Sequence, residues 1–300
     1  MDAGRRLRGA GVTERERSTL TTPTPSTLLL DASESPLIEP GYQRLLEILR
    51  KMGSVAVACS GGLDSSLLLA AAQAALDKPV VALTVVTPYM ATHEIAGAKA
   101  LTALLGVRHR VLELPMPAEI AYNPPDRCYR CKRALFTKLQ AIATVEGCAW
   151  LADGSNQDDL QDYRLGMRAL QELAVRSPLL EAGLGKAEIR RYARALNLPV
   201  WNQPAQACLL TRLPHGTAVN LEQLRQVEAA EQALRALGFN TVRVRCHADL
   251  ARIELDRVEQ IRLLDTMLTE QVAAAVLDCG FHYVTLDLQG YRMGSFNVMP

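Results

Sequence analysis

The sequence predicts an α/β fold: a doubly wound parallel sheet followed by a smaller C-terminal α+β domain. Short apolar runs alternate with helix-forming stretches, which is typical of a parallel sheet covered by helices. The runs are 54–59, 80–86, 110–114 and 149–152, and the helical stretches are 66–76, 91–105 and 132–145. Beyond residue 212 the pattern changes to a helix, an alternating hairpin and a tail strand at 283–288, with a further helix before the tail whose apolar face is marked by Ile261, Leu264 and Leu268.

Length and composition bound the class of protein. A chain of 300 residues favours two domains, and 49% hydrophobic with 22% charged residues is ordinary for a soluble cytoplasmic enzyme. No apolar run is long enough for a membrane span. We expect a flexible extension at 1–35, a nucleotide-binding domain at 36–211 and a substrate domain at 212–300.

Charge and cysteine content narrow the class further. The 33 basic and 32 acidic residues create no overall field that would gather RNA. Seven cysteines, an odd number, argue against a disulfide framework. Reduced thiols with catalytic or metal-binding work are the better expectation.

A glycine-rich loop joins the first predicted strand to the first predicted helix. Backbone amides at such a helix N-terminus bind phosphate groups, and glycines allow close approach. The loop lacks the Gly-Lys-Ser/Thr end of a Walker loop, so cleavage between the α and β phosphates fits better than γ-phosphoryl transfer. Asp64 is expected to position Mg²⁺, and Lys186, near the start of a later helix, to contact phosphate. The candidate ATP ligands are Ser60, Gly61, Gly62, Asp64, Ser65, Ser66 and Lys186.

This loop resembles that of the PP-loop, or N-type ATP pyrophosphatase, superfamily. The resemblance implies the HUP-type fold of that superfamily and transfer of AMP to a substrate oxygen.

Three cysteines are candidate metal ligands. Cys128 and Cys131 form a C-x-x-C pair whose basic neighbours are expected to favour thiolates, and Cys208 lies near the predicted domain junction. Three thiolates on a 4Fe-4S cubane would leave one iron open for an additional sulfide. Zinc would want a fourth ligand, and no His stands at matching spacing. An ordinary helix-start pair or a redox pair stays an alternative.

A narrower resemblance, to the LarE family, covers roughly residues 36–298. The matching segments are 123–132, 153–159, 162–164, 176–180, 208–216, 243–245 and 290–295. LarE proteins are sulfur transferases acting on pyridinium-3,5-biscarboxylic acid mononucleotide, the precursor of the nickel-pincer cofactor of lactate racemase. The resemblance implies ATP, Mg²⁺, a homo-oligomer, and sulfide or a sulfur-donor protein as partner.

Two sulfur sources occur among proteins of this type. One branch sacrifices the sulfur of a cysteine that matches Cys208, whereas other members hold a 4Fe-4S cluster on cysteines that match Cys128, Cys131 and Cys208. The C-x-x-C pair makes the cluster the preferred expectation here.

The implied substrate carries a phosphate and two carboxylates, for which planar bidentate cations are suited. Arg243 and Arg245 share one face of a predicted strand, while their neighbours point the other way. Arg212, near Cys208, is a further candidate, and Glu254 a weaker one. Glu231 falls on the apolar stripe of its predicted helix, where it is either a buried carboxylate that needs a partner or a residue at the edge of the stripe that reaches water. Cys208, Asp64 and Glu231 are the candidate catalytic residues.

Three other functions fit parts of the pattern. A PP-loop tRNA thiolase would share the cysteines but predicts a basic surface and a steep salt dependence. An amidotransferase-like synthetase would leave the cysteines unused. A nucleotide-sensing module would bind AMP without turnover.

Overall fold

The computed structural model describes residues 38–160, 165–204 and 206–292. The predicted flexible extension at 1–35 and the family resemblance at 162–164 lie outside the described residues.

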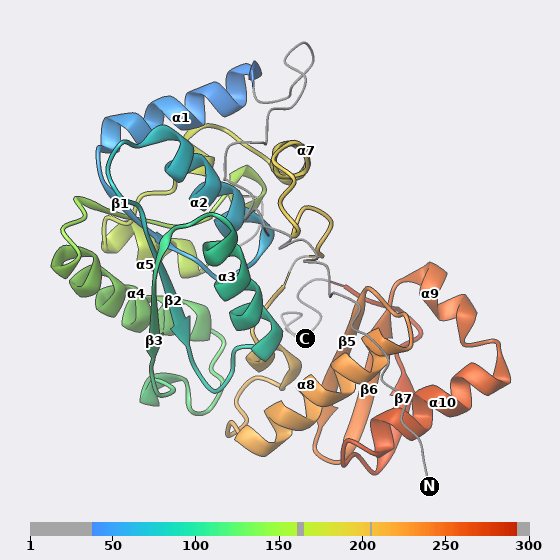
Figure 1. Cartoon of the computed structure of the whole chain (residues 1–300). Helices are drawn as coiled ribbons and strands as arrows, with labels where there is room; N and C mark the ends of the chain where they lie inside the picture. Colours follow the sequence, from blue (N-terminus) through green and yellow to red (C-terminus); the bar gives the residue numbers. More distant parts are fainter. Residues whose placement is uncertain (1–37, 161–164, 205, 293–300) are drawn as a thin grey trace, which may run out of the picture. The chain divides into compact units, whose positions relative to one another are not determined.

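The first layer of the structure is a parallel sheet of four strands in the order β3-β2-β1-β4 (Figure 1). The strands are β1 (Val55–Ala58), β2 (Val81–Val86), β3 (Arg108–Glu113) and β4 (Trp150–Ala152). All three neighbouring pairs are parallel. The predicted α/β class is therefore confirmed.

Helices cover both faces of this sheet, as side-chain alternation requires. Val55 and Val57 join one hydrophobic cluster, whereas Ala56 between them joins another. Because both faces are covered, the central strands β1 and β2 read as continuous apolar runs, whereas the edge strand β3 is largely exposed. The first cluster includes α1 (Pro40–Met52), α2 (Leu63–Ala75), α3 (Thr92–Leu104), α6 (Pro178–Glu181) and α7 (Lys186–Ala195), and the second includes α4 (Arg127–Val145) and α5 (Leu165–Glu172).

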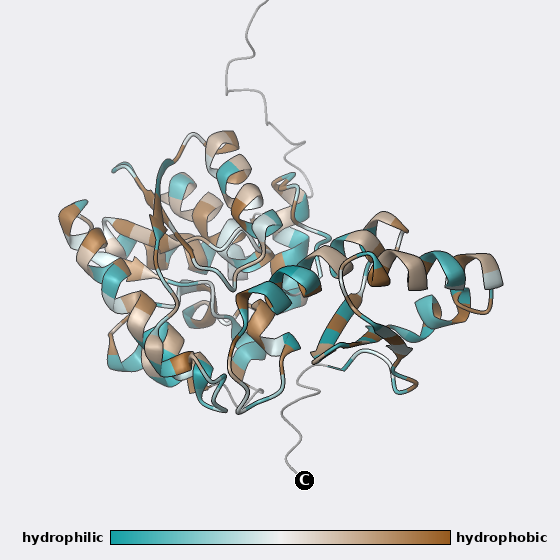
Figure 2. Ribbon diagram, turned by 90° about the horizontal axis from the view of Figure 1, so that it is seen from below, coloured by the Kyte–Doolittle hydropathy of each residue, from teal (hydrophilic) through white to brown (hydrophobic). Residues whose placement is uncertain are grey.

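A second, three-stranded sheet has the order β5-β6-β7. Its strands are β5 (Val242–His247), β6 (Leu250–Leu255) and β7 (Tyr283–Leu286), with an antiparallel first pair and a parallel second pair. Helix α8 (Leu221–Ala236) begins where the Asn220 side chain accepts a hydrogen bond from the Glu222 amide, and it packs on β5. Hydrophobic and hydrophilic segments alternate along the helices (Figure 2).

One sequence prediction for the C-terminal part is wrong. Ile261, Leu264 and Leu268 were expected to form the apolar face of one helix. The chain instead forms α9 (Arg257–Arg262) and α10 (Thr266–Leu277), because Asp265 caps the second helix by accepting from the Leu268 amide. Ile261 and Leu264 are 65% and 83% exposed.

The second sheet shares its core with residues from the predicted nucleotide domain. Tyr89 and Ile120 belong to the same cluster as Val244. The boundary near Arg212 stays a prediction. Within the described ranges, no helix has both the length and the apolar character needed to cross a membrane.

We predict that Leu67→Ala destabilises the protein by about 2 to 5 kcal/mol, because Leu67 is fully buried on α2 and truncation leaves a cavity. Denaturant unfolding measures this. Leu104→Ala, at a site 64% exposed on α3, is the control, with a change of roughly 0.5 kcal/mol or less. Equal losses for the two variants would contradict the packing described.

Candidate functional site

The phosphate loop connects β1 to α2. Its side chains fold back on the loop: Ser66 Oγ donates to the Gly62 carbonyl at 2.7 Å, and Ser65 Oγ accepts from the Ser60 amide at 3.3 Å. Helix α2 begins after Gly62 without a side-chain cap. An uncapped helix N-terminus of this kind suits an anion, and the phosphate-binding role of the loop stays a prediction.

Gly61 is required by the position of α3. Its φ is +81°, and a Cβ there would lie 2.4 Å from the Glu94 carbonyl oxygen and 2.8 Å from the Ala98 nitrogen. Both atoms are backbone, so neither can move aside without shifting the helix. The loop and the first turns of α3 therefore pack directly on each other.

The structure brings Lys186 and Asp64 together as an ion pair beside the loop. Lys186 is the first residue of α7, and Asp158 fixes it there by accepting its backbone N-H at 2.7 Å. Gly154, which follows β4, also touches the loop, since a Cβ there would lie 2.9 Å from the Ser65 nitrogen. Asp64 and Lys186, both predicted to bind ATP, are thus in contact with each other. The segment that follows β4 packs against both of them.

The three candidate metal-ligand cysteines approach one another in space. Cys128 and Cys131 lie in the first turns of α4, and Cys208 stands immediately before the short helix η4 (Leu209–Arg212). The pKa of the Cys208 thiol is raised to about 11, chiefly by burial and also by the neighbouring Cys128 and Cys131, while Arg127 and Arg212 act to lower it. In these surroundings the thiol is protonated at neutral pH.

Tyr89 connects the two parts of this cysteine set. Its hydroxyl lies 3.1 Å from Cys131 Sγ, and its carbonyl accepts from the Leu209 amide at 3.0 Å. No pattern in the sequence pointed to Tyr89. The prediction that basic neighbours favour a thiolate is wrong for Cys131, because burial raises its pKa more than Lys132 lowers it.

The described residues contain no group of three or more His, Cys, Asp or Glu side chains arranged around a single metal ion. Ligands of one tetrahedral ion must converge on one point at about 2.3 Å. Cysteines of a cubane bind different irons and stand farther apart. The ligand role of Cys128, Cys131 and Cys208 therefore stays a prediction.

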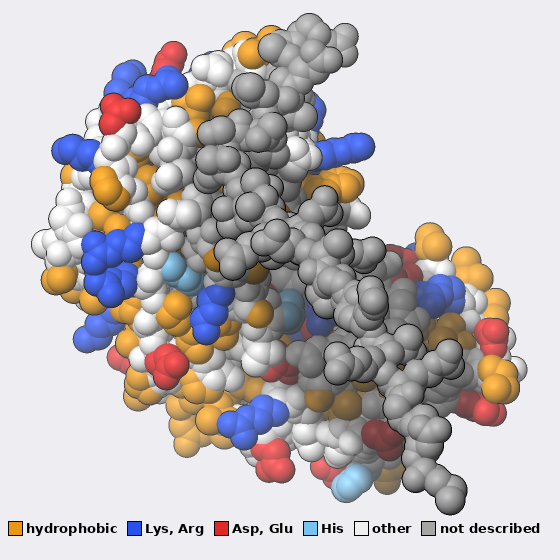
Figure 3. Space-filling view, in the orientation of Figure 1, with side chains coloured by type: hydrophobic (Ala, Val, Ile, Leu, Met, Phe, Trp, Pro, Cys, Tyr) orange, Lys and Arg blue, Asp and Glu red, His pale blue; other side chains and the backbone are white. Residues whose placement is uncertain are grey.

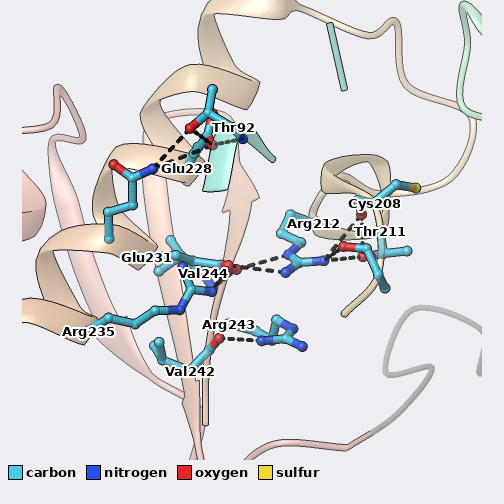
Figure 4. A network of polar contacts seen from close by, with 12 residues as sticks. Thr92, Cys208, Thr211, Arg212, Glu228, Glu231, Arg235, Val242, Arg243 and Val244 are labelled. Carbon is cyan, nitrogen blue, oxygen red and sulfur yellow. Dashed lines mark hydrogen bonds and ion pairs between the residues drawn. The ribbon is translucent and has the colours of Figure 1, made fainter. Parts of the chain in front are cut away.

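A buried ion pair organises the arginine side of the site (Figure 4). Arg212 and Glu231 are 1% and 2% exposed, and Arg212 Nε and Nη2 donate to the two Glu231 oxygens at 2.9 and 3.1 Å. Arg235 and the Val244 amide also donate to Glu231. The predicted buried carboxylate on α8 therefore has its partners.

Arg212 uses its remaining donors on the segment that carries Cys208. Its Nη1 donates to the carbonyls of Ala207 and Cys208 at 2.5 and 3.2 Å, and to Thr211 Oγ1 at 2.9 Å. Each nitrogen of the guanidinium is thus engaged, which favours a positioning role over the predicted direct contact with substrate.

Arg243 and Arg245 are both buried, so a solvated strand face is excluded for this side of β5. Arg245 pairs with Glu254 at 2.7 Å, and Glu254 also accepts from Arg252. Burial lowers the pKa of Arg243, and the nearby positive charge of Arg212 lowers it further. A bound anion would offset both the loss of water and the repulsion from Arg212. The surroundings of Arg243 therefore favour the binding of a phosphate or carboxylate group.

A residue of α8 caps the N-terminus of α3. This contact was not predicted from the sequence. Helix α3 has no side-chain cap of its own at Ala91. Glu228 supplies one, accepting from the Thr92 amide at 2.5 Å and from Thr92 Oγ1 at 2.7 Å (Figure 4). A carboxylate at a helix N-terminus is favourable.

Comparison with known proteins identifies the family. Residues 47–144 match the asparagine synthase family model. The chain is 38% identical over 257 residues to pyridinium-3,5-bisthiocarboxylic acid mononucleotide synthase of Lactiplantibacillus plantarum, covering 84% of this chain and 92% of that protein. The chain belongs to the LarE family. It is also similar to two uncharacterized proteins, one of Synechocystis (38% identity; 87% of this chain, 98% of the relative) and one of Methanocaldococcus jannaschii (29%; 81% and 92%).

Membership in the LarE family and the match over 47–144 make the chain an ATP-dependent enzyme of the PP-loop class. The matched range contains the loop from Ser60 to Ser66 and the C-x-x-C pair. The roles of individual site residues stay predictions.

In this LarE family member, Gly61→Ala is predicted to abolish ATP binding, because the new methyl group meets the α3 backbone. Isothermal titration calorimetry with ATP measures it. Gly97→Ala is the control: it lies on the opposite side of the same contact, where a Cβ would stand 3.8 Å from the Gly61 oxygen, and ATP affinity should not change. An unchanged affinity of Gly61→Ala for ATP would contradict the close packing of the loop on the α3 backbone.

Arg212→Met is predicted to cost about 3 to 5 kcal/mol of unfolding free energy, since it leaves Glu231 charged and buried. Burial acts to raise the pKa of Glu231, but its arginines lower it overall. The pair's contribution should therefore be present at neutral pH and be lost as pH falls through the lowered pKa.

The control is Arg168→Met, which breaks an exposed pair with Glu172 and should cost much less. Denaturant unfolding at several pH values measures both. A loss in Arg212→Met no larger than in the control would contradict a buried, charged Glu231.

Proposed function

We propose that this enzyme converts pyridinium-3,5-biscarboxylic acid mononucleotide to its thiocarboxylic acid form, using ATP to activate each carboxylate. The observation that carries the proposal is the 38% identity to a synthase named for the bisthiocarboxylic product, over 92% of its length. The phosphate loop and the cationic strand β5 support it, because the substrate carries a phosphate and two carboxylates. The pathway is nickel-pincer nucleotide biosynthesis for lactate racemase maturation.

Activation consists of attack by a substrate carboxylate oxygen on the α-phosphorus of ATP, with rupture of the bond to pyrophosphate. The loop amides and the hydroxyls of Ser60, Ser65 and Ser66 hold the departing diphosphate. Lys186 balances its charge. Asp64 would help hold Mg²⁺, which neutralises phosphate charge.

Sulfur transfer follows when a sulfur nucleophile attacks the acyl carbon and AMP leaves with the original carboxylate oxygen. Arg243 and Arg245 hold the phosphate and carboxylates of the substrate, with Glu254 orienting Arg245 at 2.7 Å. Arg212, held by Glu231, positions the backbone at Cys208.

Cys128, Cys131 and Cys208 would hold a 4Fe-4S cluster. When bound, such a cluster offers an iron without a protein ligand for an additional sulfide. What supports this proposal is that Cys128 and Cys131 lie close enough to Cys208 to raise the pKa of its thiol, with the cations of Arg127 and Arg212 nearby. Sulfide or a sulfur-donor protein as partner and a homo-oligomer stay part of the proposal.

The alternative is that Cys208 gives up its own sulfur. A tRNA thiolase gains no support here: on the face shown in Figure 3, basic side chains are interspersed with acidic and apolar ones.

Cys208→Ala is predicted to abolish iron binding while ATP affinity is kept, whereas anaerobically purified wild-type protein should hold about four irons per chain. Iron and sulfide analysis with calorimetry measures this. Cys279→Ala, at a partly exposed cysteine with no predicted role, is the control and should retain its iron. Mass spectrometry after turnover that finds one sulfur lost from Cys208 would overturn the cluster in favour of sacrifice.

A further inference from the structure

Glu94 lies beside the phosphate loop. It occupies the first turn of α3, which follows the carboxyl end of β2. Its carbonyl oxygen faces Gly61 so closely that a Cβ there would approach within 2.4 Å. The position of Glu94 relative to the ATP loop is therefore fixed by backbone packing.

Contacts with α8 also hold the first turn of α3 close to the buried arginines. Glu228 of α8 binds Thr92, and Glu231, one turn along α8, anchors Arg212 and Arg235. The positive charges of Arg212, Arg243 and Arg235 act on the Glu94 carboxyl. Glu94 therefore lies between the loop that binds ATP and the cluster that favours anions.

Glu94 differs from the two other acidic groups of this region. Glu231 and Glu254 each accept from two arginines. Across residues 38–160, 165–204 and 206–292, the Glu94 carboxylate makes no hydrogen bond or ion pair, although its side chain is half-buried. Burial raises the pKa of Glu94, and the arginines offset this only in part. A carboxylate in such a place gains from a cationic partner.

We propose that Glu94 recognises the positively charged ring of the substrate, while the arginines of β5 hold its anionic groups. The inference rests on the proposed function, and it makes Glu94 a residue that determines specificity. A pyridinium nucleotide carries a ring cation beside its carboxylates and phosphate. In a nucleotide with a neutral ring, the substrate carboxylate would lie near Glu94 with no ring cation to offset the repulsion. The charge of the ring should therefore determine the affinity for the nucleotide.

Two nucleotides test this without turnover. Nicotinic acid mononucleotide has a pyridinium ring and orotidine monophosphate a neutral ring, and each carries one carboxylate and a ribose phosphate. We expect the wild-type protein to bind the pyridinium nucleotide more tightly by calorimetry. Glu94→Gln should weaken that binding about tenfold and leave orotidine monophosphate unchanged or bound more tightly.

Glu270→Gln, at an exposed position on α10, is the matched control and should change neither affinity. Glu94→Asp keeps the charge and should keep the preference for the pyridinium ring, which guards against a folding defect in Glu94→Gln. ATP binding checks the fold of each variant.

Equal weakening of both nucleotides in Glu94→Gln, tighter binding of both, or no preference in the wild-type protein would overturn the inference. Tighter binding of both would mean that Glu94 only competes for the arginines. Failure of the proposed function would be seen separately, as absence of AMP formation from pyridinium-3,5-biscarboxylic acid mononucleotide in the wild-type protein.

Discussion

The buried pair of Arg212 and Glu231 is the interaction on which the rest of the site depends. Moving two charges out of water is costly, and only good geometry with further hydrogen bonds offsets that cost. Here Glu231 accepts from Arg212, Arg235 and the Val244 amide, and Arg212 donates to the Cys208 carbonyl. One ion pair thus joins α8, β5 and the segment carrying the third cysteine.

The parallel sheet supplies the other half of the arrangement. Ligands of such sheets bind beyond the carboxyl ends of the strands, where the loops after β1, β2 and β4 gather. The loop after β1 faces α3 at Gly61, and α3 is capped by Glu228 of α8. A continuous set of contacts therefore runs from the phosphate loop to the arginines, which suits an enzyme that must activate and sulfurate the same carboxylate.

Local signals in the sequence predicted the glycine-rich loop between β1 and α2, the parallel sheet and the place of Glu231 on the apolar face of its helix, because apolar periodicity and glycine placement are local properties. Effects of tertiary packing were not predictable in this way. Basic neighbours suggested thiolates, but burial governs the pKa of Cys131. The cap from Glu228 lies 136 residues from Thr92, and Tyr89 meets Cys131 only in the folded chain. The prediction of a single helix around Leu264 is wrong because the Asp265 side chain caps a second helix there.

The fate of the substrate oxygen shows whether the carboxylate is adenylated before sulfur is transferred. Pyridinium-3,5-biscarboxylic acid mononucleotide labelled with ¹⁸O in its carboxylates would be incubated with ATP, sulfide and the iron-loaded enzyme, and AMP examined by mass spectrometry. We expect one ¹⁸O atom in each AMP formed, because the carboxylate oxygen attacks the α-phosphorus and departs with it. Unlabelled AMP, or label in inorganic phosphate, would contradict activation by adenylation.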